Sequence, residues 1–427
     1  MAIAAAAGTA DLSRDRPRGD PAPPAVRAGW ALFETRVALG HLANTAAGAV
    51  SKTSNGRDVR VSLRRLAAPP ACSCLQLCTD DKVSRQPTVV SADGDLLLIH
   101  MVVAVEGVYT TKFPHNFFVY KADPESPSMR SLPPPPSDWK AWARDTGITR
   151  RGDEFVVANL KTRYTDAITM KEVAFVWLYR SATEQWETKQ FDMPYEPREG
   201  IVEFFFTTDT VFSFRGFICL VDFHRGIIYS DVFSPDPVLS FIRLPGIEIW
   251  RGERDFPNMY RTVSVCRDHV KFVDIDNGRF RSTGGRDGDN DFGYGSDDEG
   301  RSFDDNFDGC TITSWILRMP EFEWKEDASL RLLDLSSLQS YQDSPLPRAV
   351  PISPIVDMQE DNILHFIVNG PGFLDKAWMV TIDMKNKSLG QHTLYENLIP
   401  IEAKDSGQYD LTNVFLEIPL LSTQLYY

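Results

Sequence analysis

Short runs of β-branched, aromatic and aliphatic residues recur along most of this chain, separated by clusters of Gly, Pro, Asp and Ser. Runs of this length bounded by turn residues are typical of strands. Helical periodicity is confined to two short segments, 137–144 and 330–341. The pattern therefore predicts an almost all-β protein, with strand runs at 30–39, 59–63, 89–105, 117–120, 154–160 and 173–179.

Five segments share one arrangement, in which an apolar strand leads through a polar turn into a second short strand. They are 117–133, 173–191, 226–245, 312–324 and 377–395. Tyr120, Tyr179 and Tyr229 recur in them at intervals near fifty residues, and units of that length with several strands are typical of propeller blades. We expect these hairpins on the outer edges of sequential antiparallel sheets spanning 85–396, with one or two more blades within 30–106.

The predicted fold class is an all-β, propeller-like array of antiparallel four-stranded sheets. A double β-sandwich is the alternative, because the spacing is irregular and no diagnostic blade dipeptide is present. Residues 1–28, rich in Ala, Pro and Arg, are expected to be a disordered leader. Residues 29–427 are expected to form a single propeller-like domain with a disordered acidic insert at 279–309.

The charge balance and the length of the apolar runs limit the kinds of partner and the compartments that we expect for this protein. Lys and Arg total 45 against 59 Asp and Glu, a net charge of −14 that disfavours nucleic acid and anionic membranes. The longest apolar run, 96–105, is about half the length of a membrane-spanning helix. We expect a monomer in the cytoplasm or nucleus with an unknown protein partner. A plastid location is the alternative, although Asp11, Asp15 and Asp20 are unusual in a transit peptide.

Six cysteines are too few for a disulfide framework and fit a reducing compartment. Cys72, Cys74 and Cys78 would share one face of a strand, where free cysteines behave as small hydrophobic residues. Their spacing lacks the second close pair of a structural zinc site. No metal ligand is therefore assigned.

The common catalytic and cofactor-binding motifs are absent, so we assign no catalytic residue and no cofactor. His365 lies between apolar neighbours and is interpreted as a structural side chain. Asp222 and Gly226 are interpreted as residues of a tight hairpin turn that contains His224. Trp186, Trp315 and Trp378 are expected to be substantially buried in outer hairpins.

The predicted insert holds nine acids, four arginines and seven glycines. Its alternating aspartates resemble a calcium loop, but Phe292 replaces the required Gly and Asp298 replaces the bidentate Glu. Ser296 and Ser302 are each followed three residues later by an acid, a pattern that acidophilic kinases prefer, and are candidate phosphorylation sites. Pro133–Pro136, followed by Trp139 and Trp142, is either a stiff connector between blades, which we favour, or a ligand for an aromatic groove.

Several segments resemble a known plant family. They are 217–231, 237–245, 261–265, 270–274 and 312–317, with 92–98 and 117–120 upstream. Together they resemble the grass-expanded family called domain of unknown function 1618, over about residues 205–375. The resemblance implies no activity and no site residue. The hairpins also resemble the kelch-type propeller regions of plant F-box proteins, but Pro21, Pro23 and Pro24 break any F-box helix near the N-terminus.

Two functions follow from these observations. The first is a non-catalytic protein-interaction scaffold, and the alternative is a propeller hydrolase acting on glycans or other small substrates. Convergent carboxylates in a deep central pocket would favour the hydrolase. A shallow surface would favour the scaffold.

Overall fold

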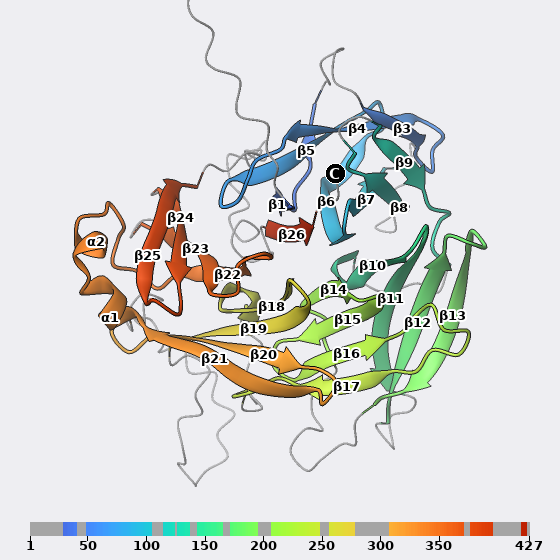
Figure 1. The fold of residues 1–427 in the computed structure, drawn as a ribbon. Coiled ribbons are helices and arrows are strands. Elements are labelled where there is room, and N and C mark those ends of the chain that lie inside the picture. Colours follow the sequence, from blue (N-terminus) through green and yellow to red (C-terminus); the bar gives the residue numbers. More distant parts are fainter. Residues whose placement is uncertain are drawn as a thin grey trace, which may run out of the picture.

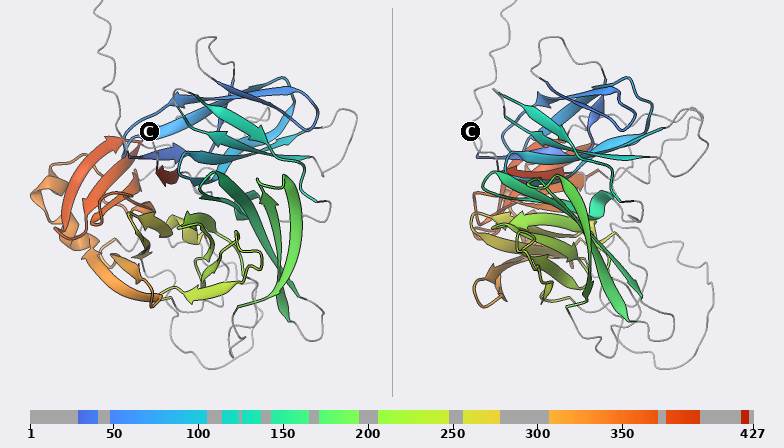
Figure 2. Two further views of the ribbon diagram at one scale, coloured as in Figure 1. Left: turned by 45° about the vertical axis from the view of Figure 1, so that its right-hand side comes forward. Right: turned by 90° about the vertical axis from the view of Figure 1, so that its right-hand side faces the viewer.

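The structure is a computed structural model and describes residues 29–40, 48–104, 114–123, 126–136, 143–164, 171–194, 206–247, 256–277, 307–370, 376–395 and 420–424. Within these ranges the strands form six sheets arranged around a ring, a six-bladed β-propeller (Figure 1). The two views of Figure 2 show the blades side by side around the ring. The predicted propeller fold is therefore confirmed.

Blades 2 to 6 are each a four-stranded antiparallel sheet whose strands follow one another in the chain. Blade 2 holds β6(Val83–Asp93), β7(Leu96–Val103), β8(His115–Lys121) and β9(Ser128–Ser131). Blade 3 holds β10(Thr146–Arg151), β11(Glu154–Tyr164), β12(Glu172–Arg180) and β13(Gln185–Asp192). Blade 4 holds β14(Thr210–Phe214), β15(Phe217–Asp222), β16(Gly226–Ser230) and β17(Ser240–Arg243).

Blade 5 holds β18(Arg261–Cys266), β19(His269–Asp276), β20(Thr311–Arg318) and β21(Glu323–Arg331). Blade 6 holds β22(Ile352–Val356), β23(Ile363–Asn369), β24(Ala377–Asp383) and β25(Ser388–Leu394). Two short helices, α1(Leu332–Ser336) and α2(Gln339–Gln342), join these blades and confirm the helical signal predicted at 330–341. Two 3-10 turns, Ala143–Asp145 and Pro257–Met259, precede β10 and β18.

Blade 1 closes the ring with strands from both ends of the described chain. It combines β1(Trp30–Glu34), β2(Ala38–Leu39), β3(Ala49–Lys52), β4(Asp58–Arg65) and β5(Cys72–Thr79) with the C-terminal β26(Leu420–Gln424). Strand β26 pairs antiparallel with β1, and β1 pairs parallel with β5. Blade 1 is thus a six-stranded sheet, unlike the four-stranded sheets that were predicted. The β26–β1 pairing ties the two ends of the chain into one sheet and leaves no open seam in the ring.

The five predicted hairpins are the last two strands of blades 2 to 6, and in Figure 1 they lie toward the outside of the ring. The tryptophan prediction is only partly confirmed. Trp186, Trp315 and Trp378 are half-buried, each on one of the last two strands of its blade. Among the described residues, Trp177 on β12 and Trp30 on β1 are buried.

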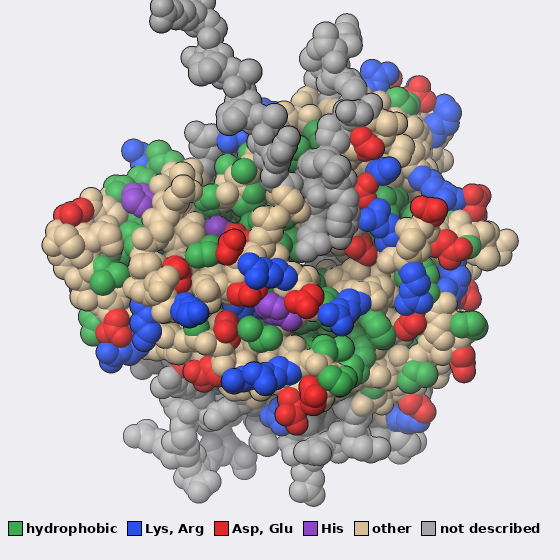
Figure 3. All heavy atoms as spheres, in the orientation of Figure 1, with side chains coloured by type: hydrophobic (Ala, Val, Ile, Leu, Met, Phe, Trp, Pro, Cys, Tyr) green, Lys and Arg blue, Asp and Glu red, His purple; other side chains and the backbone are tan. Residues whose placement is uncertain are grey.

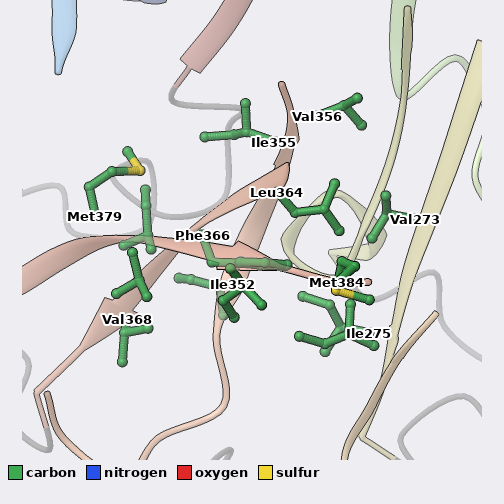
Figure 4. Packing of buried hydrophobic residues seen from close by; sticks show 14 of the residues in the cluster. Val273, Ile275, Ile352, Ile355, Val356, Leu364, Phe366, Val368, Met379 and Met384 are labelled. Carbon is green, nitrogen blue, oxygen red and sulfur yellow. The ribbon is translucent and has the colours of Figure 1, made fainter. Parts of the chain in front are cut away.

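The hydrophobic core is divided among the interfaces between neighbouring blades. Val211 and Leu220 of blade 4 pack with Leu178 of blade 3, and similar clusters lie at the other interfaces. The largest cluster joins blades 5, 6 and 1 (Figure 4), where Phe366 and Leu364 of β23 lie near Val273 and Ile275 of β19. Each blade is therefore stabilised mainly by its two neighbours, as in other repeat architectures.

The Asp222–Gly226 turn has the predicted structural role. Asp222 is fully buried and accepts backbone N–H bonds from Thr207 and His224, each at 2.9 Å. A Cβ atom at Gly226 would meet the Ile242 carbonyl oxygen and lie 2.6 Å from the Phe241 ring. Glycine is therefore needed there because β17 approaches the backbone of β16 closely.

Candidate functional site

The turns that follow the first strand of blades 2 to 6 form a connected group, here called the inner-turn face. They comprise residues 93–96, 151–154, 214–217, 266–269 and 357–362. The first four turns contain two residues between paired strand ends, and such tight hairpins favour φ above zero. Arg215 (φ 52°), Gly216 (φ 82°) and Arg267 (φ 52°) adopt it.

Arginine side chains link these turns from one blade to the next. Arg151 of blade 3 pairs with Asp231 of blade 4 at 2.9 Å. Arg215 of blade 4 donates to the Asp268 carbonyl oxygen of blade 5 at 3.1 Å. Arg267 of blade 5 donates to the Gln359 carbonyl oxygen of blade 6. Three successive turns therefore use an exposed arginine to contact the following blade.

On this face, a polar cluster joins blades 2, 3 and 4. The Asp93 carboxylate of blade 2 accepts hydrogen bonds from the Arg150 backbone N–H at 2.6 Å and from Ser213 Oγ of blade 4 at 2.8 Å. Ser213 in turn lies 2.8 Å from Thr149 Oγ1 of blade 3. Asp95, nearly buried, pairs with Arg150 at 2.6 Å. The acidic groups at this point are thus engaged in joining blades.

The exposed charges of the inner-turn face are mixed in sign. Asp268 and Glu360 are 83% and 68% exposed, and Asp153 and Glu154 are exposed beside them in sequence on the blade 3 turn. On the side of the molecule that Figure 3 presents, acidic and basic side chains are likewise interleaved. Mixed charge of this kind favours directional pairing with a protein over binding to a uniformly charged polymer.

One described cavity lies away from this face, between blades 3 and 4. Its walls are mostly aliphatic and come from both blades: Ala158, Leu160, Val176, Leu178, Ile218, Leu220 and Val232, with Asn159 and Ser230 as polar members. It belongs to the packing between the blades and brings no group of carboxylates together.

His365, which was expected to be a structural side chain, and His224 of the Asp222–Gly226 turn are both buried. His365 is buried and lies between Thr381 Oγ1 at 3.0 Å and Asp357 Oδ2 at 3.2 Å. Asp357 also accepts the backbone N–H bonds of Gln359 and Glu360, and these hydrogen bonds and His365 hold the pKa of its carboxyl below the usual range despite burial, which opposes them. His224 is buried in the turn after Asp222, with Nδ1 3.5 Å from Arg261.

The cysteines are all free thiols, and Cys72 and Cys74 are buried on strand β5 as expected. Burial raises the pKa of both thiols. A different cysteine takes part in a cluster of metal-ligating side chains. Cys266, His269 and Asp361 bring one donor atom each to within 4.8 Å of one another. The spacing of three residues between Cys266 and His269 is visible in the sequence. No sequence pattern connects Asp361 to them, because it belongs to the next blade.

Other predicted sites lie partly or wholly outside the described residues. Ser296, Ser302, the alternating aspartates and residues 1–28 fall there, as do Trp139 and Trp142. The acidic insert was expected to extend to residue 309. Phe307, however, is buried in the cluster that includes blades 5 and 6. Pro133–Pro136 follows β9 and leads toward blade 3, where Trp186 Nε1 donates to the Pro133 carbonyl at 2.9 Å, as expected of a connector.

No helix in the described part of the chain is long and apolar enough to cross a membrane. No curated protein matches the sequence. Among solved structures, the GH32 beta-fructofuranosidase BmSUC1 of Bombyx mori is 10% identical with a TM-score of 0.28, over 72% of this chain and 58% of that one. This chain therefore spans less than two thirds of that enzyme.

Two other solved structures are similar at the same level. A family 117 glycoside hydrolase of Zobellia galactanivorans is 11% identical with a TM-score of 0.28, over 80% of this chain and 86% of that one. A variant of the apocarotenoid oxygenase of Synechocystis is 10% identical with a TM-score of 0.32, over 84% and 74%. Similarity this low carries no information on activity. The model of a family described as protein of unknown function (DUF1618) matches residues 221–365, within the segment where the sequence resembled that family.

Proposed function

We propose that this propeller is a non-catalytic protein-interaction scaffold that binds its partner through the inner-turn face. The observation that carries the proposal is that some carboxylates of this face are engaged in hydrogen bonds between blades, whereas others are exposed to solvent. The Asp93 carboxylate is committed to hydrogen bonds with Arg150 and Ser213, whereas Asp153, Glu154, Asp268 and Glu360 of the same group of turns are exposed. These acids alternate with exposed arginines of the same turns, so the face favours a partner whose charges are arranged to pair with both.

The hydrolase alternative is less well supported. A glycosidase needs two carboxyl groups facing one substrate across a cleft. The inner strands β6, β10 and β14 contact one another directly, and Asp93, Ser213 and Thr149 occupy the point where they meet. The Asp93 carboxylate there is engaged in hydrogen bonds that join three blades, and no described residue supplies a second carboxyl group facing it across a cleft.

Charge reversal on the face tests the proposal. A variant carrying Asp153→Lys, Asp268→Lys and Glu360→Lys is compared with the parent protein as bait in native extract, with captured proteins identified by mass spectrometry. The matched control carries Glu321→Lys, Glu323→Lys and Glu326→Lys, which change the same charge on the exposed outer edge of blade 5. We expect a set of partners retained by the control and lost by the face variant.

An identical set of partners for all three proteins would overturn the placement of the binding face. Turnover of a glycan library by the purified protein, abolished by Asp93→Asn, would instead establish the hydrolase. Circular dichroism of each variant confirms that the fold is intact before binding is compared.

A further inference from the structure

Cys266 and His269 lie opposite each other at the base of a two-residue turn. They end β18 and begin β19 and are paired across the two strands. Directly paired residues of antiparallel strands project to the same face of the sheet. The turn thus presents a thiol and an imidazole side by side toward blade 6.

Asp361 completes the group from the loop between β22 and β23 of blade 6. Its Oδ1 lies 3.1 Å from Cys266 Sγ and 3.5 Å from a ring nitrogen of His269, Nε2. Zinc binds sulfur at about 2.3 Å and nitrogen or oxygen at about 2.0–2.2 Å, so donors around a tetrahedral ion lie about 3.3–3.7 Å apart. The two distances to Asp361 Oδ1 are already close to that spacing, and all three donors lie within 4.8 Å of one another.

The orientation of the imidazole is also that of a metal ligand. His269 Nε2 is buried and has no hydrogen-bond partner, although a buried ring nitrogen ordinarily has one. His269 Nδ1 lies on the other side, 3.5 Å from Asp268 Oδ1. A carboxylate beside the second ring nitrogen is the usual partner of a metal-bound histidine, since it fixes the ring orientation.

The surroundings can hold the added charge. Lys271, fully buried, contacts the Asp361 carbonyl oxygen, and its charge is paired with Asp327 at 2.7 Å. Arg267 Nη1 lies 3.6 Å from Asp361 Oδ2 and leaves Oδ1 to the cysteine and histidine. Asp361 is 37% exposed, which gives an ion a route to the site from solvent.

We propose that Cys266 Sγ, His269 Nε2 and Asp361 Oδ1 bind a divalent metal ion of the zinc type that joins blade 5 to blade 6. Sulfur and imidazole donors select zinc over magnesium or calcium. Three protein ligands leave one position for water, as in open zinc sites. On binding, the thiol loses its proton to solvent and a sulfur–metal bond forms, with no change in oxidation state.

This proton loss makes the affinity depend on pH. The metal ion displaces the thiol proton, so the affinity for the metal should rise as the pH rises.

Cobalt is the direct probe, because Co²⁺ bound to a thiolate gives a sulfur-to-metal charge-transfer absorption. The full-length protein, stripped with chelator and checked for its β-sheet circular dichroism, is titrated with Co²⁺ and then with competing Zn²⁺. We expect one equivalent of Co²⁺ with the charge-transfer band, and its displacement by Zn²⁺. Zn²⁺ should also raise the thermal unfolding midpoint.

Variants identify the ligands. Cys266→Ser should abolish the charge-transfer band, and His269→Gln, which keeps a polar side chain of similar size at this partly buried position, should weaken metal binding at least about 10-fold. Cys78→Ser, which removes a half-buried thiol from blade 1, is the matched control and should bind as the parent does. Absence of stoichiometric binding by the folded parent protein would overturn the proposal, as would an unchanged band in Cys266→Ser or unchanged affinity in His269→Gln.

Discussion

Tyr395 Oη donates a 2.7 Å hydrogen bond to Glu34 Oε1 across 361 residues of sequence. Glu34 ends β1 in blade 1, and Tyr395 follows β25 at the end of blade 6. The carboxyl group is fully buried, and its other oxygen, Oε2, has no hydrogen-bond partner. Burial raises the pKa of Glu34, with the Tyr395 hydrogen bond opposing the rise. This bond supplements the β26–β1 pairing where the first and last blades meet.

We expect Tyr395→Phe to lower the free energy of unfolding by about 1–3 kcal/mol, because it leaves the Glu34 carboxyl buried without its donor. Tyr341→Phe is the control, since it removes a 2.9 Å bond from a half-buried hydroxyl to the Pro347 carbonyl, which water can replace more readily. Denaturant unfolding of both variants measures the difference. An equal loss would show that the Glu34 contact has no special role in closing the ring.

Acid should destabilise the protein through a histidine pair in blade 2. His100 Nε2 lies 2.8 Å from His115 Nδ1, and the two rings stack with centroids 5.1 Å apart. Burial, and then the charges of His115 and Arg85, lowers the pKa of His100 to about 3, and burial also lowers that of His115. In the unfolded chain both titrate near their ordinary pKa of about 6.5.

The unfolded state therefore binds more protons below about pH 6.5, and the free energy of unfolding falls as the pH decreases toward 3. Each such proton contributes up to about 1.4 kcal/mol per pH unit. We expect His100→Gln to flatten this slope relative to the parent, in unfolding curves measured between pH 7 and pH 4. A parent slope unaffected by His100→Gln would contradict the prediction.

The repeated features of the fold could be read from the sequence. Each outer hairpin has an apolar strand, a short turn and a second strand, and these local signals do not depend on the rest of the chain. Blade 1 could not be predicted in the same way. Its closure joins residue 30 to residue 424, and a five-residue strand such as β26 carries no sign of its distant partner.

The candidate sites depend on contacts between blades, which no local pattern records. Arg151, Arg215 and Arg267 are unremarkable turn residues until the ring places each beside the next blade. Cys266 and His269 form a local pair, but Asp361 joins them only because β22 packs beside β18. Cys72, Cys74 and Cys78 stand out because they are close in sequence, whereas Cys266 gains its third neighbour, Asp361, only in space.

The two classes of tryptophan should differ in their contribution to stability. Trp177, on the central strand β12, is 1% exposed, so Trp177→Ala should cost about 3–5 kcal/mol through lost burial and a new cavity. Trp315 is half-buried and stacks on Phe272 with centroids 5.2 Å apart. We expect Trp315→Ala to cost clearly less, because solvent already reaches part of the ring. Equal losses in denaturant unfolding would count against this ranking.

Gly226 should tolerate a methyl group less well than any ordinary strand glycine. An alanine Cβ there would meet the Ile242 carbonyl oxygen, and backbone of a paired strand cannot move aside as the end of a long side chain can. Gly390→Ala in β25 is the matched control, since its Cβ would lie 3.2 Å from the Thr381 carbonyl and needs a shift of only a few tenths of an ångström. Both substitutions also lower the entropy of the unfolded chain, by a similar amount that favours folding. The difference between the two therefore reports the steric clash alone, and we expect Gly226→Ala to be less stable than Gly390→Ala by about 1–3 kcal/mol. Unfolding curves that place the two variants at the same stability would show that β17 can move away from β16, and that the packing of this edge of blade 4 does not require glycine.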